Sequence, residues 1–523
     1  MKSLLEKVPH TRSERGQAIV LIAFAFIGLV AAVGLVADTG LLMIEYGKLK
    51  RGVDAAAVAA AQEFRPDPDT GTLNVTAMEN AALSMLHINQ AQNVRDVVVH
   101  TCEDTGADRP ALCNPNPITD PINNRKLVEV TAVADVGFGF LRVLGINSAE
   151  ITVSSIGEAA TIDLVLLIDT SGSMAYETTG LPTQPDTGDD PRVCNANDNC
   201  QPMRAVKDVA LDFVDSLIYF GYDRVAVIAM TGQAPNASAA ATRNPVEVIP
   251  LSFDRNNILY SIDTLKVFQP RICDGTDTPG ECLEYINGVF NRPICQTYQL
   301  RIGSNDLGVR ATADPSSCPS SNIGGMLALA QEAYSGSGNA NNQRVESLWV
   351  TVLLASGPAN ATNGNTSYPY GFCPQNTWLA AYLPDNPKPK LCRDPYPNTY
   401  HSAGSALVPY TNPISGENKD ISLYDADDFA RDQADNLAAM KDRNGVTIYT
   451  IGLGAGVKVL APGEPAGSTT GEAEYLLQYI ARDAGNSLNS NINHGDYFYA
   501  PNNVTLRNIF EIIAQNIATK ISQ

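Results

Sequence analysis

One stretch restricts the possible folds of this chain more than any other: an apolar run that ends in a carboxylate and two hydroxyls. Residues 162–168 are apolar apart from Asp163, and Asp169, Ser171 and Ser173 follow at D-x-S-x-S spacing. Such a run is typical of a strand buried on both faces, as in a parallel sheet covered by helices. The three polar side chains then lie in the loop at the carboxyl end of this strand, where open α/β sheets bind ligands.

Two interpretations of this polar loop fit the residues. Hard oxygen donors gathered in one loop suit a divalent cation such as Mg2+, which keeps several waters and one exchangeable position. Alternatively, Ser171 or Ser173 caps the helix that follows, and the helix dipole favours the charge of Asp169. The spacing of these three common residues does not by itself separate the two.

Predicted strands and helices alternate through residues 161–523, which indicates a doubly wound, mostly parallel α/β sheet. Pro250 favours an edge position for the strand at 246–251. Gly452, Gly454 and Gly456 follow a strand, but no helix follows them directly, so we expect a turn there rather than a dinucleotide site. The other expected strands cover residues 224–231, 348–355, 446–452 and 497–500, and the expected helices cover residues 203–217, 254–265, 427–442, 472–484 and 504–521.

The ten cysteines lie between residues 102 and 392 and form sequence-local pairs. The chain has no C-x-x-C motif, and its five histidines lie far from the cysteines in sequence, which disfavours a zinc site. Disulfides formed in an oxidising compartment explain this pattern better. Sequence alone does not fix connectivity. Pairing of nearest neighbours predicts Cys102/Cys113, Cys194/Cys200, Cys273/Cys282, Cys295/Cys318 and Cys373/Cys392.

The polar loop and the order of elements after it resemble von Willebrand factor type A domains. Their metal-ion-dependent adhesion site combines a D-x-S-x-S loop, a threonine in a G-T-N-I-like loop and an aspartate in a T-D-G loop. Ser321, in Ser-Ser-Asn-Ile, falls on that threonine and offers the same oxygen, although it can also cap the next helix. Ser356, in Ala-Ser-Gly, replaces the aspartate, which contributes through a water.

This resemblance implies a six-stranded sheet with one antiparallel edge and a site for Mg2+ or another divalent cation. Asp169 is the only matched carboxylate, so we expect weaker metal binding than in a complete site, unless an acid from an insertion substitutes. Three insertions, at residues 175–200, 266–319 and 358–424, lie within the loops that build the metal site in this family. The implied metal ligands are Asp169, Ser171, Ser173, Ser321 and Ser356, and the nearby acids are Glu177, Asp186, Asp189 and Asp190.

The N-terminal segment predicts a membrane helix. Residues 18–37 carry no charge, and this stretch is long enough to span a bilayer. The first fifteen residues hold two lysines and two arginines. This flank predicts a cytoplasmic N-terminus and an extracytoplasmic bulk. A secretory signal peptide is the alternative. Its cleavage site would lie around Ala37, although the apolar segment before this site is long for a signal peptide. The helix is expected to continue through the alanine-rich residues 54–62 and to end before Pro66.

The same segment resembles the TadE/TadG-like family of Tad (Flp) pilus assembly. The matching residues are Gly16-Gln-Ala-Ile-Val, Val36-Ala-Asp-Thr-Gly40 and Leu49-Lys-Arg-Gly-Val-Asp-Ala-Ala-Ala-Val-Ala-Ala-Ala61. In that family a prepilin peptidase can cut after a glycine that precedes the apolar helix, which here implies cleavage between Gly16 and Gln17. Major pilins carry glutamate at the fifth residue after this glycine, where this chain has Leu21, so a permanent anchor is nearly as well supported. A plain membrane anchor of unrelated origin is the remaining alternative.

These segments divide the chain into a leader (1–16), a long helix (17–65), a small α/β pilin-like domain (66–160) and the type A domain (161–523). In the third of them we expect a helix at 76–93, strands at 94–101, 126–136 and 151–156, and a short helix at 138–144. Nothing in it suggests catalysis, so we expect it to have a packing role.

The composition excludes several classes of function. A net charge of −20 argues against nucleic acid or anionic lipid as the main partner. The chain has no G-x-S-x-G, H-E-x-x-H or P-loop motif, so we expect no enzyme. We expect a single-pass surface protein of a Tad-type pilus, a minor pilin or assembly protein, which binds pilus components, other surface proteins or an acidic ligand group through its metal. The alternative is a structural filament subunit or assembly factor with a vestigial metal site.

Overall fold

The first element is a single long helix, α1 (Glu14–Gln62), as the uncharged and alanine-rich stretches predict. It is the one helix among the described residues that is long and apolar enough to cross a membrane, and its apolar N-terminal half is almost wholly exposed. The structure is a computed structural model. It describes residues 14–67, 70–89, 91, 93–175, 190–231, 244–273, 281–295, 301–302, 305–306, 321–336, 343–363, 400–402, 408–411, 418–421, 424–441, 444–458, 460 and 468–521.

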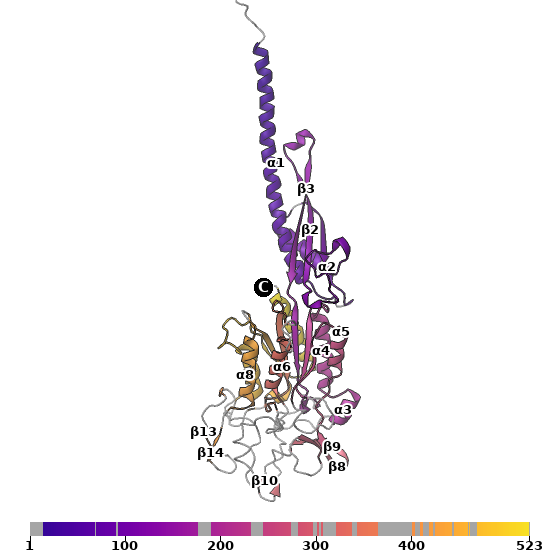
Figure 1. Cartoon of the computed structure of the whole chain (residues 1–523), viewed down its shortest axis with the longest axis vertical. Helices are drawn as coiled ribbons and strands as arrows, with labels where there is room; N and C mark the ends of the chain where they lie inside the picture. Colours follow the sequence, from indigo (N-terminus) through magenta and orange to yellow (C-terminus); the bar gives the residue numbers. More distant parts are fainter. Residues whose placement is uncertain are drawn as a thin grey trace, which may run out of the picture. The chain divides into compact units, whose positions relative to one another are not determined.

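The described residues form two compact units (Figure 1). The N-terminal unit holds α1, α2 (Val75–Ile88) and an antiparallel sheet in the order β1-β2-β3. The strands are β1 (Val94–Thr101), β2 (Lys126–Gly137) and β3 (Ser148–Ala159). The helix predicted at 76–93 ends at Ile88, because Asn89 caps it by donating a side-chain hydrogen bond to the carbonyl of Met85 (2.9 Å). The strand predicted at 151–156 is longer, since β3 pairs with β2 over its whole length.

The C-terminal half of α1 packs on this sheet. Val53, Ala56, Ala57 and Ala60 are fully buried. The small alanines let the backbones approach so closely that a Cβ on Gly157 of β3 would lie 2.2 Å from the carbonyl oxygen of Ala57. Helix–sheet packing in this unit therefore depends on small residues on both elements.

The hairpin that joins β2 to β3 ends in a short 3-10 helix, η3 (Leu141–Leu144), within the predicted helix at 138–144. Asp38 of α1 fixes this turn. Its carboxylate accepts hydrogen bonds from the backbone N–H groups of Gly139 (2.9 Å), Phe140 (3.0 Å) and Leu141 (2.6 Å). The tip of the hairpin is thus held against α1 directly after the end of the uncharged stretch.

The C-terminal unit is built on a six-stranded sheet in the order β16-β15-β12-β4-β5-β6. All neighbouring strands are parallel except β5 and β6, so the expected antiparallel edge is confirmed. Its fold is the doubly wound α/β class that the sequence predicts. The strands are β4 (Ile162–Ile168), β5 (Arg224–Ala229), β6 (Val246–Ser252), β12 (Leu348–Ala355), β15 (Thr447–Leu453) and β16 (Tyr497–Ala500).

Helices cover both faces of this sheet. Leu164 and Leu166 of β4 point into one core, with helices α4 (Met203–Leu217), α5 (Arg255–Asp263) and α10 (Asn503–Ile521). Val165 and Leu167 point into the other core. Its helices are α6 (Ile323–Tyr334), α8 (Ala426–Ala439) and α9 (Glu472–Arg482). Burial on both faces explains why β4 reads as a continuous apolar run.

The predicted insertions contain short elements that the sequence did not indicate. They are α3 (Pro191–Asn197), a small sheet of β7 (Arg271–Ile272), β8 (Glu281–Ile286) and β9 (Val289–Cys295), and the hairpins β10 (Arg301–Ile302) with β11 (Asn305–Asp306) and β13 (Val408–Thr411) with β14 (Asn418–Ile421). The two-residue strands β7, β10 and β11 carry little period-2 pattern, so local sequence gives no signal for them.

Two of the predicted disulfides are present, Cys102–Cys113 and Cys194–Cys200. Cys273 is also disulfide-bonded. The predicted pairs Cys295/Cys318 and Cys373/Cys392 include Cys318, Cys373 and Cys392, which lie outside the described residues, and the side chain of Cys282 does as well.

We expect a thiol-blocking reagent to label none of the ten cysteines in native protein until a reductant is added. The even number of cysteines, their local spacing and the bonded state of five of them are the reasons. Mass spectrometry of alkylated protein, with and without prior reduction, measures the labelling. Several labelled thiols in freshly isolated, unreduced protein would contradict this prediction.

Candidate metal centre

The candidate site begins where β4 ends. The N–H of Asp169 still donates to the carbonyl of Leu354 on β12 (3.2 Å), so the sheet positions this residue directly. The chain then turns through Ser171 into the 3-10 helix η4 (Gly172–Ala175). The predicted helix cap takes a different form, because the side chain of Asp169 accepts the N–H of Ser171 (2.8 Å) in a tight local turn.

Four of the five predicted ligands form one hydrogen-bond network. The hydroxyls of Ser171 and Ser173 lie 2.8 Å apart, and those of Ser173 and Ser356 lie 2.6 Å apart. The Ser356 hydroxyl donates to Oδ2 of Asp169 (2.6 Å), and the Ser356 N–H donates to the same oxygen (2.7 Å). Residues from two neighbouring strand ends, more than 180 positions apart in sequence, are thereby brought together.

Ser321 adjoins this network through its backbone. Its N–H donates to the side-chain oxygen of Asn360 (2.9 Å), and its carbonyl accepts the N–H groups of Asn360 (3.1 Å) and Ala361 (3.3 Å). These bonds tie the loop before α6 to the segment that follows Ser356. In the part of the chain that the structure describes, the Ser321 hydroxyl makes no hydrogen bond to the other four predicted ligands. Asn322, rather than Ser321, caps α6 by accepting the N–H of Gly325 (2.8 Å).

The charge of Asp169 is the most informative feature of the site. The residue is 0% exposed, and its carboxylate accepts hydrogen bonds from neutral donors only. Among the described residues, no lysine, arginine or histidine forms an ion pair with it. A buried carboxylate without a cationic partner is costly, and a bound cation removes that cost. One carboxylate and several hydroxyl oxygens form a donor set that fits Mg2+.

Glycines allow another loop to pack on the site. A Cβ on Gly456 would lie 2.2 Å from the carbonyl oxygen of Ser356, so only glycine permits this approach. Gly454, with φ +73°, forms the preceding turn, and the short helix η8 (Ala455–Lys458) follows it. The predicted turn is therefore confined to Gly454, because Gly452 lies within β15 and Gly456 lies within η8. The role of Gly456 in packing on Ser356 was not predicted, because the contact joins residues one hundred positions apart.

The ends of the insertions also lie at the site. The N–H of Phe268, at the start of the second insertion, donates to the carbonyl of Thr170 (2.7 Å). Asn195 of α3, near the end of the first insertion, exchanges two hydrogen bonds with the backbone of Val267 (2.7 and 2.9 Å). With the Ser321–Asn360 bonds, these contacts place described parts of the second and third insertions beside the candidate site, and they join the end of the first insertion to the start of the second.

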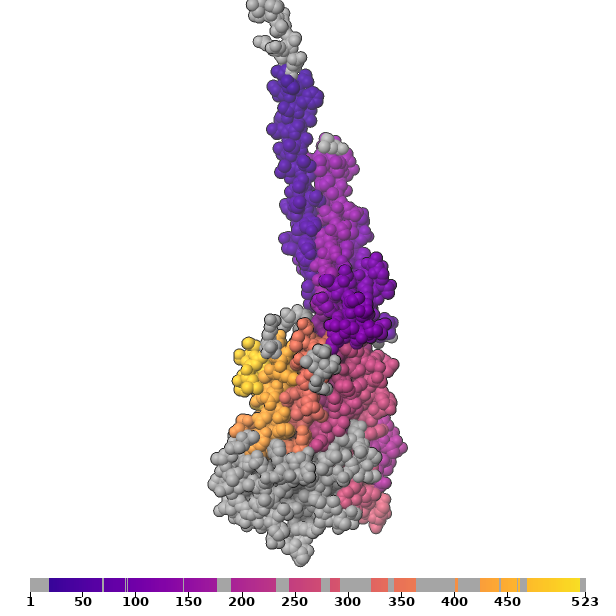
Figure 2. Space-filling model, in the orientation of Figure 1, coloured from indigo at the N-terminus to yellow at the C-terminus, as the bar shows by residue number. Residues whose placement is uncertain are grey.

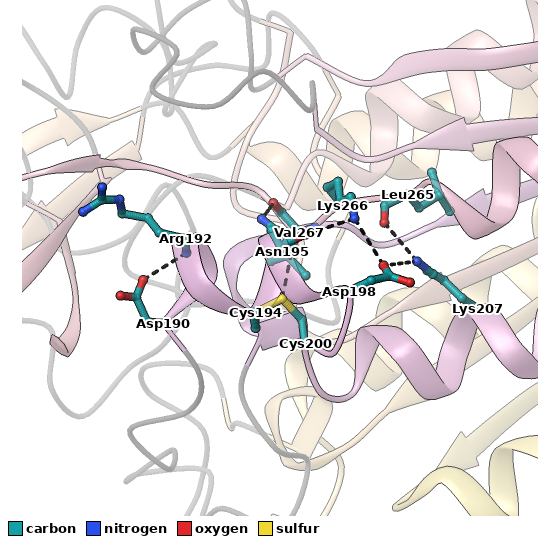
Figure 3. The surroundings of a disulfide bond; sticks show 10 residues. All are labelled: Asp190, Arg192, Cys194, Asn195, Asp198, Cys200, Lys207, Leu265, Lys266 and Val267. Carbon is teal, nitrogen blue, oxygen red and sulfur yellow. Dashed lines mark hydrogen bonds and ion pairs between the residues drawn. A yellow bond between two sulfur atoms is a disulfide. The ribbon is translucent and has the colours of Figure 1, made fainter.

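A disulfide and an ion cluster stabilise the end of the first insertion (Figure 3). Cys194–Cys200 closes the turn after α3, and Asp198 within it bonds Lys207 (2.5 Å) and Lys266 (3.2 Å). Burial raises the pKa of the Asp198 carboxyl, but Lys207, Lys266 and Arg204 outweigh burial and lower this pKa to about 2. Asp198 therefore stays ionised and holds the insertion to α4.

The structure identifies no second carboxylate for the site. Glu177, Asp186 and Asp189 lie outside the described residues. Asp190 uses one oxygen to cap α3 at the N–H of Arg192 (2.9 Å) and the other to accept the hydroxyl of Tyr285 (2.6 Å). Within the described ranges, no group of three histidine, cysteine, aspartate or glutamate side chains could hold a metal ion. Among the described residues, the oxygens that adjoin Asp169 at this site are therefore hydroxyl oxygens.

No protein family and no curated protein matches the chain. Similar solved structures include the PilB minor pilin from Streptococcus sanguinis, at 14% identity and a TM-score of 0.33, over 82% of this chain and 79% of that one. The von Willebrand factor domain of the type V pili tip protein Mfa5 from Porphyromonas gingivalis has 14% identity and a TM-score of 0.33, over 70% and 97%. Proximal thread matrix protein 1 from the mussel byssus, with a zinc-occupied MIDAS motif, has 11% identity and a TM-score of 0.29, over 69% and 46%. Values this low assign no function.

Proposed function

We propose that the chain is a non-enzymatic surface protein of a Tad-type pilus system, either a minor pilin or an assembly protein. Helix α1 anchors it in the membrane or in a helical filament core. The C-terminal unit binds a partner through a divalent cation, and an acidic group of the partner completes the coordination. Asp169, Ser171, Ser173 and Ser321 supply oxygens to the cation, and Ser356 acts at the position of the missing aspartate.

This proposal rests on Asp169, which is fully buried and, among the described residues, forms no ion pair with a lysine, arginine or histidine. The α/β scaffold brings Asp169, Ser171, Ser173 and Ser356 together at the carboxyl end of the sheet and holds Ser321 beside them. Hydroxyls supply no charge, so the single carboxylate gives the cation its main attraction. The bound cation would polarise no substrate in this role, because the coordination position left open is filled by a ligand carboxylate.

A second candidate is a structural subunit or assembly factor whose site no longer binds metal. The closed network favours it, since Ser356 donates twice to Asp169 and satisfies the oxygen that a metal or its water would use. In this alternative the serine network replaces the cation and only stabilises the loops. Binding of divalent cations separates the two candidates.

We expect Asp169→Ala to abolish Mg2+ and Mn2+ binding, because only neutral hydroxyls remain. We expect Ser356→Asp to tighten binding at least about tenfold, because a second charge ~4 Å from the cation is worth up to about 4 kcal/mol at an effective dielectric constant of ~20. Isothermal calorimetry of the full chain in detergent measures both effects. Asp212→Asn is the matched control, since Asp212 is an exposed acid on α4 that pairs with Arg507.

The control should bind the cation as the wild type does, which removes non-specific attraction by the net charge as an explanation. If Ser356→Asp fails to tighten binding, or if Asp169→Ala binds as well as the wild type, the adhesion-site proposal fails. The structural candidate then becomes the better description.

We expect the mature chain to begin at Gln17, because a glycine directly precedes the uncharged helix. Leu21, at the position of the pilin glutamate, counts against this processing. Mass spectrometry of the N-terminus in assembled material decides it. A chain that keeps its leader would reject processing and favour a fixed membrane anchor.

A further inference from the structure

We propose that the tip of the β2–β3 hairpin, residues 138–147, inserts its apolar side chains into the interface of the phospholipid bilayer beside α1. This inference rests on the proposed role of α1 as a membrane anchor. It adds a second contact with the membrane. This contact is made by a part of the chain that lies about a hundred residues after Asp38 of α1 in sequence. Figure 2 shows the magenta hairpin beside the indigo helix, which continues beyond it.

The position of the tip along α1 is the first argument. Asp38 is the first charged residue after the uncharged stretch 18–37, and it holds the tip through the N–H groups of three consecutive residues. Gly34, about 6 Å further into that stretch at 1.5 Å per residue, is so close to the tip that a Cβ there would meet the Cβ of Phe140 at 2.7 Å. The tip therefore lies level with the last turn of the predicted membrane helix.

The exposed side chains of the tip are the second argument. Phe140 is 51% exposed, Val143 87% and Ile146 50%. Arg142 is the only charged residue between Asp135 and Glu150. Large apolar side chains clustered at one end of a unit, next to an exposed apolar helix, mark a surface that is normally covered. An arginine among them can extend its guanidinium to lipid phosphates while its stem stays in the apolar region.

The hydrogen bonding of the tip is the third argument. Insertion into an apolar medium is costly for any backbone group without a partner. The N–H groups of Gly139, Phe140 and Leu141 bond Asp38, and those of Val143, Gly145 and Ile146 bond carbonyls within the tip at 3.0–3.1 Å. The contact also covers the carboxylate of Asp38, which is 2% exposed and so is shielded from lipid.

These observations favour lipid over a second copy of the chain as the occupant, because the apolar surface of the tip continues that of the exposed helix at the same level. The test uses the full chain in two sets of vesicles, whose phospholipids carry bromine either near the upper end or near the methyl end of the acyl chain and quench nearby tryptophans. The first set reports on the interface, and the second reports on the bilayer centre, since Ile27 lies in the middle of the uncharged stretch 18–37. Val143→Trp reports on the tip. Ile27→Trp reports on the anchor, and Leu112→Trp is the matched control.

Leu112 is also exposed and apolar, and it lies in the loop between β1 and β2, at the opposite end of β2 from the tip. The two native tryptophans give the background, which the wild-type chain measures. We expect quenching of Val143→Trp to exceed that of Leu112→Trp at least about twofold, since interfacial segments lie ~5–10 Å deep in the headgroup and acyl boundary. Ile27→Trp should be quenched as well.

Strong quenching of Ile27→Trp with Val143→Trp no different from Leu112→Trp would overturn the inference and leave the anchor intact. A blue-shifted but unquenched Val143→Trp would also overturn it, because the tip would then be covered by protein. Absence of quenching at Ile27→Trp would reject the membrane anchor itself, and the insertion of the tip with it.

Discussion

Asp163→Asn is expected to lower the free energy of unfolding of the C-terminal unit by about 3–5 kcal/mol, the usual cost of leaving a buried charge without its partner. Asp163 is the second residue of β4 and is fully buried. Its carboxylate bonds Arg224 through two oxygens (2.6 and 2.9 Å), and Arg344 lies 3.4 Å from it. Burial lowers the pKa of Arg344, and the charge of Asp163 opposes this shift by stabilising the charged guanidinium. The neutral amide of the variant cannot stabilise the buried guanidinium in this way.

Urea unfolding, followed by tryptophan fluorescence, measures this loss, because Trp349 is buried beside Asp163 in the register of β12 and β4. Asp215→Asn is the matched control. Asp215 pairs with Arg255 on the surface, and removal of an exposed pair should cost less than about 1 kcal/mol. A triple variant, Asp163→Leu with both arginines changed to methionine, should recover much of the loss, since buried ion groups are often replaceable by apolar ones. Equal effects of Asp163→Asn and Asp215→Asn would contradict the prediction.

Gly157→Val should disrupt the N-terminal unit, with a loss of at least about 3 kcal/mol, the upper part of the range for overpacked cores. The added Cβ would meet the carbonyl oxygen of Ala57 at 2.2 Å and its carbonyl carbon at 2.5 Å. These are backbone atoms inside a 49-residue helix, so no side chain can rotate to make room. Either α1 or β3 must move, and the core formed by Val53, Ala56 and Ala60 loses its contacts.

Hydrogen exchange of the full chain in detergent tests this at the amides of α2 and β3. Gly137→Val is the matched control, because a Cβ on Gly137, in the same sheet, meets nothing within 4 Å. Valine there should leave exchange unchanged, since β-branched residues favour strands. Slow exchange in both variants would contradict the close packing of Gly157 on the backbone of α1.

Sequence reasoning predicted the scaffold well where the pattern was long and regular. The run at 162–168 predicted β4 with the observed bounds, and the strand expected at 348–355 is β12. The resemblance to type A domains implied that Asp169, Ser171, Ser173 and Ser356 belong to one site, and their side chains do form one hydrogen-bond network. Sequence reasoning could not foresee Asn360, Gly456 or the Asp38 cap, since each of these acts through a contact with a residue remote in sequence and leaves no local pattern.

The connectivity of β4 has a mechanical consequence. The chain passes from the N-terminal unit straight into β4, and the proposed ligand is held at Asp169, directly after this strand. Tension between an anchored α1 and a held ligand would therefore be carried by seven residues. Parallel neighbours, β12 and β5, flank them on both sides. The pull runs along the strand and across its hydrogen bonds, which must then shear together rather than open one by one. At the proposed ligand site, such a load would fall first on β4 and on its hydrogen bonds to β12 and β5.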